Sequence, residues 1–367
     1  MIPVNEPVIS KESRKYVNQA LKSGWLSSAG PYVKQFEDRF AKLIGVKHAI
    51  SVNTGTAALH VALLAAGVGK GDEVIVPAFT MAATWLAVIY TGAKPVFVDA
   101  EIDTYNIDPN LIEAKITPRT KAIIPVHIYG HPADMDPIVT LAHKHRLVVI
   151  EDAAEAHGAT YRGKIVGGIG DMGCFSFYAN KLITTGEGGM VVTNNDELAK
   201  EARMYKDLYH SPAKRFIHEK VGYNYRLTNL QAAVGLGELS HLSDYITKKQ
   251  AMSRRYSDGL SNIKGIVVPK TKDYVTNVYW MYAIRLTQDF ALSKDQLRQK
   301  LLSEYEIDTR DYFYAPGDQP ILKEYLEAGE LFPVTTLIAK SGLYLPSGLA
   351  ITNDQIDTVI TAVGELA

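Results

Sequence analysis

The chain has 367 residues, 47% of them hydrophobic and 22% charged, which suits a globular protein with a sizeable core. Its 39 Lys and Arg residues nearly balance its 40 Asp and Glu residues, so we expect neither nucleic acid nor a membrane surface as a partner. The single cysteine excludes an internal disulfide framework, and without clusters of Cys and His we expect no metal site and a cytoplasmic protein that acts on small molecules.

Short β-branched runs alternate with helical stretches along the first part of the chain. After a helix signal at residues 10–23, strands are expected at residues 73–77, 95–99, 122–127 and 147–152. This alternation predicts an α/β fold with a mostly parallel sheet flanked by helices. The apolar strands end in polar residues, which would lie at the edge of the sheet where such folds bind ligands. These residues are Asp99, His127 and Asp152.

A candidate anion site lies at residues 51–60, where a short strand enters a helix through Thr-Gly-Thr. Free backbone N–H groups at Gly55 and Thr56, together with the positive end of the helix dipole, would attract a phosphate. Taken alone, such a segment is more often an ordinary helix N-cap. Ser176, at the end of another apolar run, could add a hydroxyl group.

Asp152 ends the strand at residues 147–152 and has two interpretations. It could cap a helix, or it could pair with the nitrogen of a pyridine ring and keep that nitrogen protonated. Glu155 follows on the same face. Because Glu151 and Asp152 alternate along the strand, only one of them can point into a site.

Lys181 lies between an apolar run and a glycine-rich turn at residues 186–189. Most loop lysines are solvated surface charges. A lysine used for Schiff-base chemistry needs an aldehyde partner, most commonly pyridoxal 5'-phosphate, which requires a phosphate site and a carboxylate for its ring nitrogen. The segments around Gly55 and Asp152 offer both, so we predict that Lys181 is the nucleophile.

The C-terminal part of the chain predicts a smaller α+β domain. A long helical pattern begins at Asn229, and Gly259 suggests its end or a break. A strand at residues 279–285, a helix at 293–305 and a final helix from Asn353 follow. We therefore predict a large cofactor-binding domain at residues 1–245 and a small domain at residues 246–367.

The order of these elements resembles the DegT/StrS sugar aminotransferases, which are pyridoxal-phosphate enzymes of fold type I. The resemblance extends over almost the whole chain. It is carried by residues 24–30 (Gly-Trp-Leu-Ser-Ser-Ala-Gly), 77–80 (Pro-Ala-Phe-Thr), 125–130 (Pro-Val-His-Ile-Tyr-Gly), 151–155 (Glu-Asp-Ala-Ala-Glu), the Lys181 segment and 222–229 (Gly-Tyr-Asn-Tyr-Arg-Leu-Thr-Asn).

The resemblance implies a role for each candidate residue. Lys181 would bond covalently to the cofactor, Asp152 would pair with its ring nitrogen and Glu155 would lie near its ring hydroxyl. Gly55, Thr56 and Ser176 would hold the phosphate. Asn224 would reach the phosphate from a neighbouring subunit, which implies a homodimer with shared active sites. Ser28, Arg226 and Arg310 are the predicted substrate-binding residues.

Two positions depart from the family pattern. Met81 stands where the family usually has an aromatic residue that stacks on the cofactor, and a thioether can also pack on a ring face. The second departure lies in residues 309–316, where relatives that act on nucleotide-linked 4-keto sugars commonly show Arg-Pro and, further on, a histidine. In this chain Gly317 and Asp318 stand where that histidine is expected. This segment helps to form the substrate end of the site.

The resemblance implies an aminotransferase that moves an amino group from glutamate to a keto sugar. A sister group with histidine in place of the lysine removes a hydroxyl group instead, and Lys181 argues against that activity. Three segments most resemble perosamine synthases, which aminate GDP-4-keto-6-deoxymannose for surface polysaccharides. They are residues 25–28, 180–189 and 222–226. Alternatives are another nucleotide-linked keto sugar, a keto-cyclitol, a free 8-keto-octulosonate or a noncatalytic regulatory protein.

Overall fold

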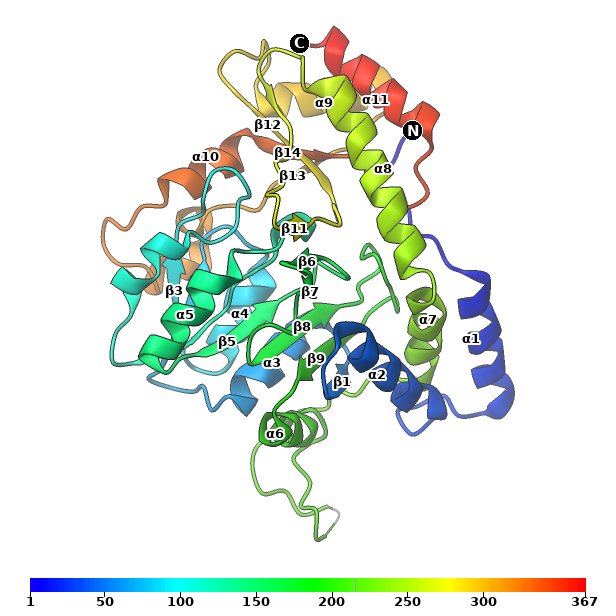
Figure 1. Cartoon of the computed structure of the whole chain (residues 1–367), viewed down its shortest axis with the longest axis vertical. Coiled ribbons are helices and arrows are strands. Elements are labelled where there is room, and N and C mark those ends of the chain that lie inside the picture. The colour runs from blue at the N-terminus through cyan, green and yellow to red at the C-terminus, as the bar shows by residue number, and fades with distance from the viewer. Residues whose placement is uncertain (215) are drawn as a thin grey trace.

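The computed structural model, which describes residues 1–214 and 216–367, is built around a seven-stranded mixed sheet in the order β1-β9-β8-β5-β4-β2-β3 (Figure 1). Only β9 runs antiparallel to its neighbours in this sheet, and the other strands are parallel to one another. The mostly parallel sheet predicted from the strand pattern is confirmed. The strands are β1 (His48–Val52), β2 (Glu73–Pro77), β3 (Lys94–Val98), β4 (Thr120–Ile123), β5 (Val148–Asp152), β8 (Met172–Ser176) and β9 (Gly189–Thr193).

Helices cover both faces of this sheet because its strands are apolar on both sides. In β2, Ile75 packs into the core on one face, whereas Val74 and Val76 pack into the core on the other. One face is covered by α2 (Pro31–Ile44), α5 (Met135–His145) and α7 (Asn229–Leu239), and the other by α3 (Gly55–Ala65), α4 (Ala82–Tyr90) and α6 (Asp196–Lys206). The N-terminal helix α1 (Lys11–Ser23) packs on α7.

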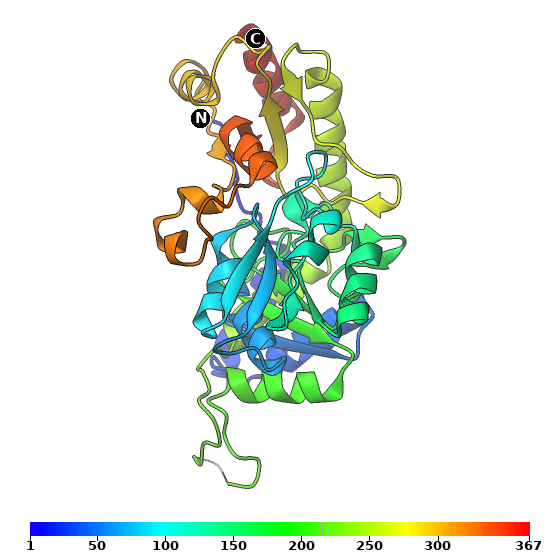
Figure 2. The same cartoon turned by 90° about the vertical axis from the view of Figure 1, so that its left-hand side faces the viewer.

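A second, antiparallel sheet of four strands lies above the first in the view of Figure 2. Its strands, in spatial order, are β10 (Ile266–Val267), β12 (Tyr282–Leu286), β14 (Gly342–Leu345) and β13 (Arg310–Asp311). The helices α8 (Leu242–Leu260), α9 (Lys294–Tyr305) and α11 (Asn353–Glu365) share its core, and α10 (Pro333–Ser341) precedes β14. A third, small sheet joins β11 (Val275–Thr276) to β6 (Thr160–Tyr161) and β7 (Lys164–Ile165).

The first residues of the chain are bonded to this C-terminal part. The amide of Ile2 donates to the carbonyl of Glu306 at 2.7 Å, and the amide of Ser347 donates to the carbonyl of Val4 at 2.9 Å. The predicted division at residues 245 and 246 falls in the first turn of α8. It stays a prediction. No helix in the described ranges is long and apolar enough to cross a membrane.

The single long helix predicted from Asn229 is wrong, because α7 ends at Leu239 and α8 begins at Leu242, and between them His241 leaves the helical conformation. The Ser240 hydroxyl donates to the carbonyl of Gly237 at 2.6 Å, which satisfies a carbonyl at the end of α7. Gly259 does mark the end of α8, which stops at Leu260. A Cβ there would lie 2.7 Å from Ile360, so the glycine allows α11 to pack closely.

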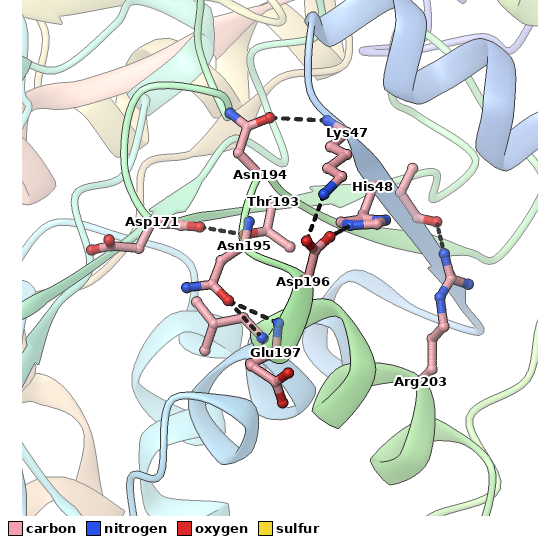
Figure 3. Close-up of polar contacts among 11 residues, drawn as sticks. Lys47, His48, Asp171, Thr193, Asn194, Asn195, Asp196, Glu197 and Arg203 are labelled. Atoms are coloured by element: carbon pink, nitrogen blue, oxygen red, sulfur yellow. Dashed lines mark hydrogen bonds and ion pairs between the residues drawn. The ribbon is translucent and has the colours of Figure 1, made fainter. Parts of the chain in front are cut away.

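The edge strand β1 is fixed to the start of α6 by a polar cluster (Figure 3). The Asp196 carboxylate binds the ammonium group of Lys47 at 2.5 Å and the His48 ring at 2.6 Å. Asn195 caps α6 by accepting the amide of Glu197 at 2.9 Å. Because β1 leads directly into the turn before α3, these contacts help to fix where α3 begins.

Candidate active site

A cavity of about 440 Å³ lies at the carboxyl ends of the parallel strands, as expected for an open α/β sheet. Trp280, Phe313 and Tyr344 line it from the C-terminal part of the chain. Seven predicted site residues line the same cavity: Gly55, Thr56, Met81, Asp152, Glu155, Ser176 and Lys181. These residues, which come from seven separate segments, therefore converge on one space.

The start of α3 forms one end of this cavity. The Thr54 hydroxyl accepts the amide of Ala57 at 3.0 Å, whereas the amides of Gly55 and Thr56 precede the first possible helical acceptor. A Cβ on Gly55 would lie 2.7 Å from the Cβ of Ser176, so only glycine allows β8 to approach so closely. Two free amides, a hydroxyl and the positive end of a helix dipole together suit a phosphate.

Asp152 forms a second wall of the cavity and is almost completely buried. Its carboxylate accepts the Thr84 hydroxyl at 2.8 Å and the amide of Ala154 at 3.2 Å. Burial raises the pKa of Asp152, whereas these two hydrogen bonds and the nearby Lys181 lower it. A cationic partner in the cavity would stabilise the charged carboxylate further.

Glu151 points away from the cavity, as the alternation along β5 requires. Its carboxylate accepts the amides of Gly167, Ile169 and Gly170, each at 2.7 Å. The His127 ring accepts the amide of Ala133 on Nδ1, so its Nε2 carries the proton that it donates to Glu151 at 3.0 Å. These contacts fix the loop before β8 and give Glu151 a structural role.

Asp99, the third polar residue expected at the ligand-binding edge, does not line the cavity. Its carboxylate accepts the amides of Val334 and Thr335 at 2.9 and 2.8 Å, at the start of α10. Asp99 therefore holds a helix terminus in place. Of the three strand-end residues, only Asp152 faces the cavity.

Lys181 lies in the turn after β8, where its amide donates to the carbonyl of Tyr178 at 2.9 Å. Its Nζ atom lies 3.6 Å from the centre of the Trp280 ring. Burial lowers the pKa of Lys181, while Glu155 and Asp152 oppose this change. A lysine with a lowered pKa has more of the uncharged amine that acts as a nucleophile.

Glu155 is the acidic neighbour of this lysine. Burial raises its pKa to about 7, against the influence of Lys181 and of a 2.7 Å hydrogen bond from the amide of Tyr129. Tyr129 has a positive φ of 52°, an uncommon conformation for a non-glycine residue, and this turn directs its amide at Glu155. The cavity thus holds an amine and two carboxyl groups in a mostly apolar surrounding.

Comparison with known proteins identifies this arrangement. Residues 7–364 match the DegT/DnrJ/EryC1/StrS aminotransferase family. The chain belongs to this family. A GDP-perosamine synthase from Caulobacter vibrioides is 43% identical over 369 residues, covering 100% of this chain and 98% of that protein.

Solved structures agree with this assignment. DesV of S. venezuelae is 39% identical with a TM-score of 0.90, over 96% of this chain and 94% of DesV. Spr1654 from Streptococcus pneumoniae, solved in its PLP form, is 26% identical with a TM-score of 0.93, over 100% of this chain and 98% of that one. The protein is a pyridoxal-phosphate-dependent aminotransferase, as predicted from its motifs.

The residues around the cavity fit this cofactor. The free amides at the start of α3 and the Ser176 hydroxyl would hold its phosphate, and the Asp152 carboxylate would hold a proton on its ring nitrogen. The bound cofactor supplies an aldehyde that reacts with amines and a ring that accepts electrons. Lys181 has the one amine among the described residues that line the cavity.

We expect Gly55→Ala to weaken binding of pyridoxal phosphate about tenfold, because the added methyl group would push Ser176 away from the start of α3. The dissociation constant can be measured by titrating the cofactor-free protein. Gly69→Ala is the matched control, since a Cβ there meets nothing within 4 Å. Equal dissociation constants for the two variants would contradict this role of Gly55.

Met81 lies at the start of α4 and lines the cavity with about half of its surface exposed. That its thioether packs on the bound cofactor ring stays a prediction. The individual roles of the predicted cofactor residues stay predictions, although the structure brings seven of them together.

Sequence reasoning did not single out Tyr178, Asn180, Trp280, Phe313 or Tyr344, which also line the cavity. Tyr178 and Asn180 lie within the Lys181 segment, so proximity in sequence could have found them. Trp280, Phe313 and Tyr344 come from the C-terminal sheet and its loops. Their side of the cavity depends on how the two sheets pack, which no local pattern encodes.

Four predicted residues lie outside this cavity. Ser28, Asn224 and Arg226 line a separate cavity of about 1150 Å³, where Arg226 pairs with Asp207. Arg310 lies in β13 opposite Tyr344, and its guanidinium group donates to Asp308 at 2.9 Å. Within one chain, these four residues do not line the Lys181 cavity.

Proposed function

We propose that this aminotransferase moves the amino group of glutamate to a nucleotide-linked 4-keto-6-deoxy sugar, as a cytoplasmic step in glycan assembly. The observation that carries this proposal is the 43% identity, over the whole chain, to a protein named GDP-perosamine synthase. A lysine at position 181 supports amine transfer over loss of a hydroxyl group, because an amine can both attack a carbonyl and carry a proton.

The cavity chemistry supports the same activity. Burial lowers the pKa of Lys181 against the opposing influence of Glu155 and Asp152, so its free amine accepts and donates a proton more readily than that of an exposed lysine. Trp280, Phe313 and Tyr344 shield the cavity from water on the C-terminal side. Water exclusion strengthens the influence of the two buried carboxyl groups on Lys181.

The second cavity supports a nucleotide sugar as the substrate. Beside apolar residues and the pair of Arg226 with Asp207, its lining includes hydroxyl, amide and imidazole groups, which bind sugar hydroxyls and phosphate oxygens. Its volume of about 1150 Å³ exceeds what glutamate alone would need. Ser28, Asn224 and Arg226 are the residues that we propose contact the substrate or its neighbouring cofactor.

We also propose that the enzyme is a homodimer with shared active sites. In a single chain, Asn224 and Arg226 line a different cavity from Lys181. A second copy that set its Asn224 and Arg226 beside the Lys181 cavity would complete each site with residues from both chains. Most homo-oligomers are dimers with a twofold axis, which creates two equal sites at once.

Mixing two inactive variants tests this arrangement. Lys181→Ala and Asn224→Ala should each have little activity, but a mixture refolded together should recover about a quarter of the wild-type activity, because random pairing gives half mixed dimers with one intact site each. Mixing Lys181→Ala with Asp152→Asn is the matched control and should recover nothing, since both residues lie in the same chain's cavity. No recovery in the first mixture would contradict shared sites.

The substrate proposal is tested by release of 2-oxoglutarate from glutamate in the presence of different keto sugars. We expect sustained release only with nucleotide-linked 4-keto-6-deoxy sugars, the GDP-linked mannose derivative foremost. Release with a keto-cyclitol or a free 8-keto-octulosonate instead would overturn the proposal and favour those alternatives. If neither 2-oxoglutarate nor an amino sugar forms with any acceptor, the proposed substrate class is wrong.

A further inference from the structure

Lys249 is a buried lysine that does not line the Lys181 cavity. It lies in the middle of α8, and only 2% of its surface is exposed. Its Nζ atom donates to the carbonyl of Trp280 at 2.7 Å and to the carbonyl of Ser347. Within the described residues its contacts include no carboxylate. Burying an amine costs free energy, and the two hydrogen bonds to backbone carbonyls offset part of that cost.

Trp280 connects this lysine to the active site. Its carbonyl is bound by Lys249, its ring lies 3.6 Å from Nζ of Lys181, and its indole N–H donates to the carbonyl of Asn180 at 2.9 Å. Asn180 directly precedes Lys181. Trp280 therefore contacts Lys181 through its ring and Asn180 through its N–H group. Lys249 binds the backbone of the same tryptophan.

The two lysines also line one small cavity of about 10 Å³. Glu6 and Asn180 line it too. This volume is close to the space that a single water molecule needs. Lys249 and Lys181 therefore lie on the wall of the same small cavity.

We propose that Lys249 is a positioning residue for Lys181: by binding the carbonyls of Trp280 and Ser347, it holds the Trp280 ring against the catalytic amine. A cation over the face of an indole ring is stabilised by the ring's electrons. The fixed ring therefore favours the protonated form of Lys181 and limits how far burial lowers its pKa.

Other groups that face Lys181 act in addition to the ring. Glu155 and Asp152 raise its pKa, and burial lowers it. His157 lies nearby, but burial lowers its pKa to about 3, so it carries no charge at neutral pH. Burial also lowers the pKa of Lys249 to about 7. The uncharged amine still has two N–H groups for its two carbonyls, so its contacts should persist on both sides of that pH.

The test is the pH dependence of cofactor uptake by the cofactor-free protein. Only the uncharged amine of Lys181 attacks the aldehyde of pyridoxal phosphate, so the midpoint of the rate against pH reports its pKa. We expect Lys249→Met to lower this midpoint by about one pH unit, because the displaced ring no longer stabilises the charged amine. Lys249→Arg, which keeps donors for both carbonyls, should return the midpoint to the wild-type value.

Lys248→Met is the matched control, since Lys248 is the next residue of α8 and is exposed. It should leave the midpoint unchanged. If Lys249→Met melts at a lower temperature but keeps the wild-type midpoint, Lys249 is only structural and the proposal is wrong. Should Lys249→Met not fold, Trp280→Leu tests the second step of the proposal, since removal of the ring must lower the midpoint if the ring sets it; an unchanged midpoint would overturn the proposal.

Discussion

Replacement of Lys181 by alanine is expected to lower the rate of amine transfer at least about 10⁴-fold, because it removes both the nucleophile and the proton carrier of the reaction. Other described residues that line the cavity bring no second amine. The Lys181 side chain contacts the Trp280 ring rather than a buried hydrogen-bond partner, so its loss should cost little stability. The rate of 2-oxoglutarate formation from glutamate measures the effect, and urea unfolding checks the fold.

Two controls separate chemistry from folding in this experiment. Lys248→Ala removes an exposed lysine and should keep the wild-type rate. A small primary amine added to Lys181→Ala should recover part of the activity, because it can carry the proton that the side chain carried. A Lys181→Ala enzyme that retains more than a tenth of the wild-type rate would show that another group does this work.

The strand order shows which parts of the fold a sequence pattern can encode. The strand at residues 73–77 was predicted with its observed bounds, and the other three lie within a few residues of β3, β4 and β5. Each is a short apolar run in a parallel sheet that is covered on both faces. The place of β9 between β1 and β8 depends on contacts between distant segments. The break at Ser240 was missed because the apolar spacing continues from Leu239 to Leu242 across it.

The residues of the candidate site also fall into those that a local sequence pattern predicts and those that only the packing of distant segments reveals. Gly55 begins a helix, Asp152 ends a strand and Lys181 lies in the turn after one, where local pattern and fold class together predict a ligand-binding edge. Lys249 is one of two adjacent lysines in an amphipathic helix, and the sequence does not distinguish the buried lysine from the exposed one. Only the packing of α8 against the loop before β12 shows that Lys249 reaches the Trp280 carbonyl.

Asp152→Asn is expected to slow amine transfer about 10²-fold or more, because the amide cannot hold a positive charge on the ring nitrogen of the cofactor. Asparagine is nearly isosteric: its oxygen can accept the amide of Ala154, and its NH₂ group can donate to the Thr84 hydroxyl, which then donates to Thr80. Stability should therefore change much less than turnover. The rate with saturating glutamate and the dissociation constant of the cofactor should be measured for the same preparation, so that slow chemistry is distinguished from weak binding.

The neighbouring residue on β5 provides the matched comparison. Glu151→Gln should leave the rate per folded enzyme close to wild type but lower the free energy of unfolding by about 3 kcal/mol. The reason is that the NH₂ group of glutamine cannot accept the backbone N–H groups that donate to the carboxylate oxygens of Glu151. Urea unfolding at neutral pH measures that loss. Asp152→Asn should thus lose turnover and keep stability, whereas Glu151→Gln should lose stability and keep turnover. If Glu151→Gln lost turnover and Asp152→Asn did not, the assignment of the two faces of β5 would be wrong.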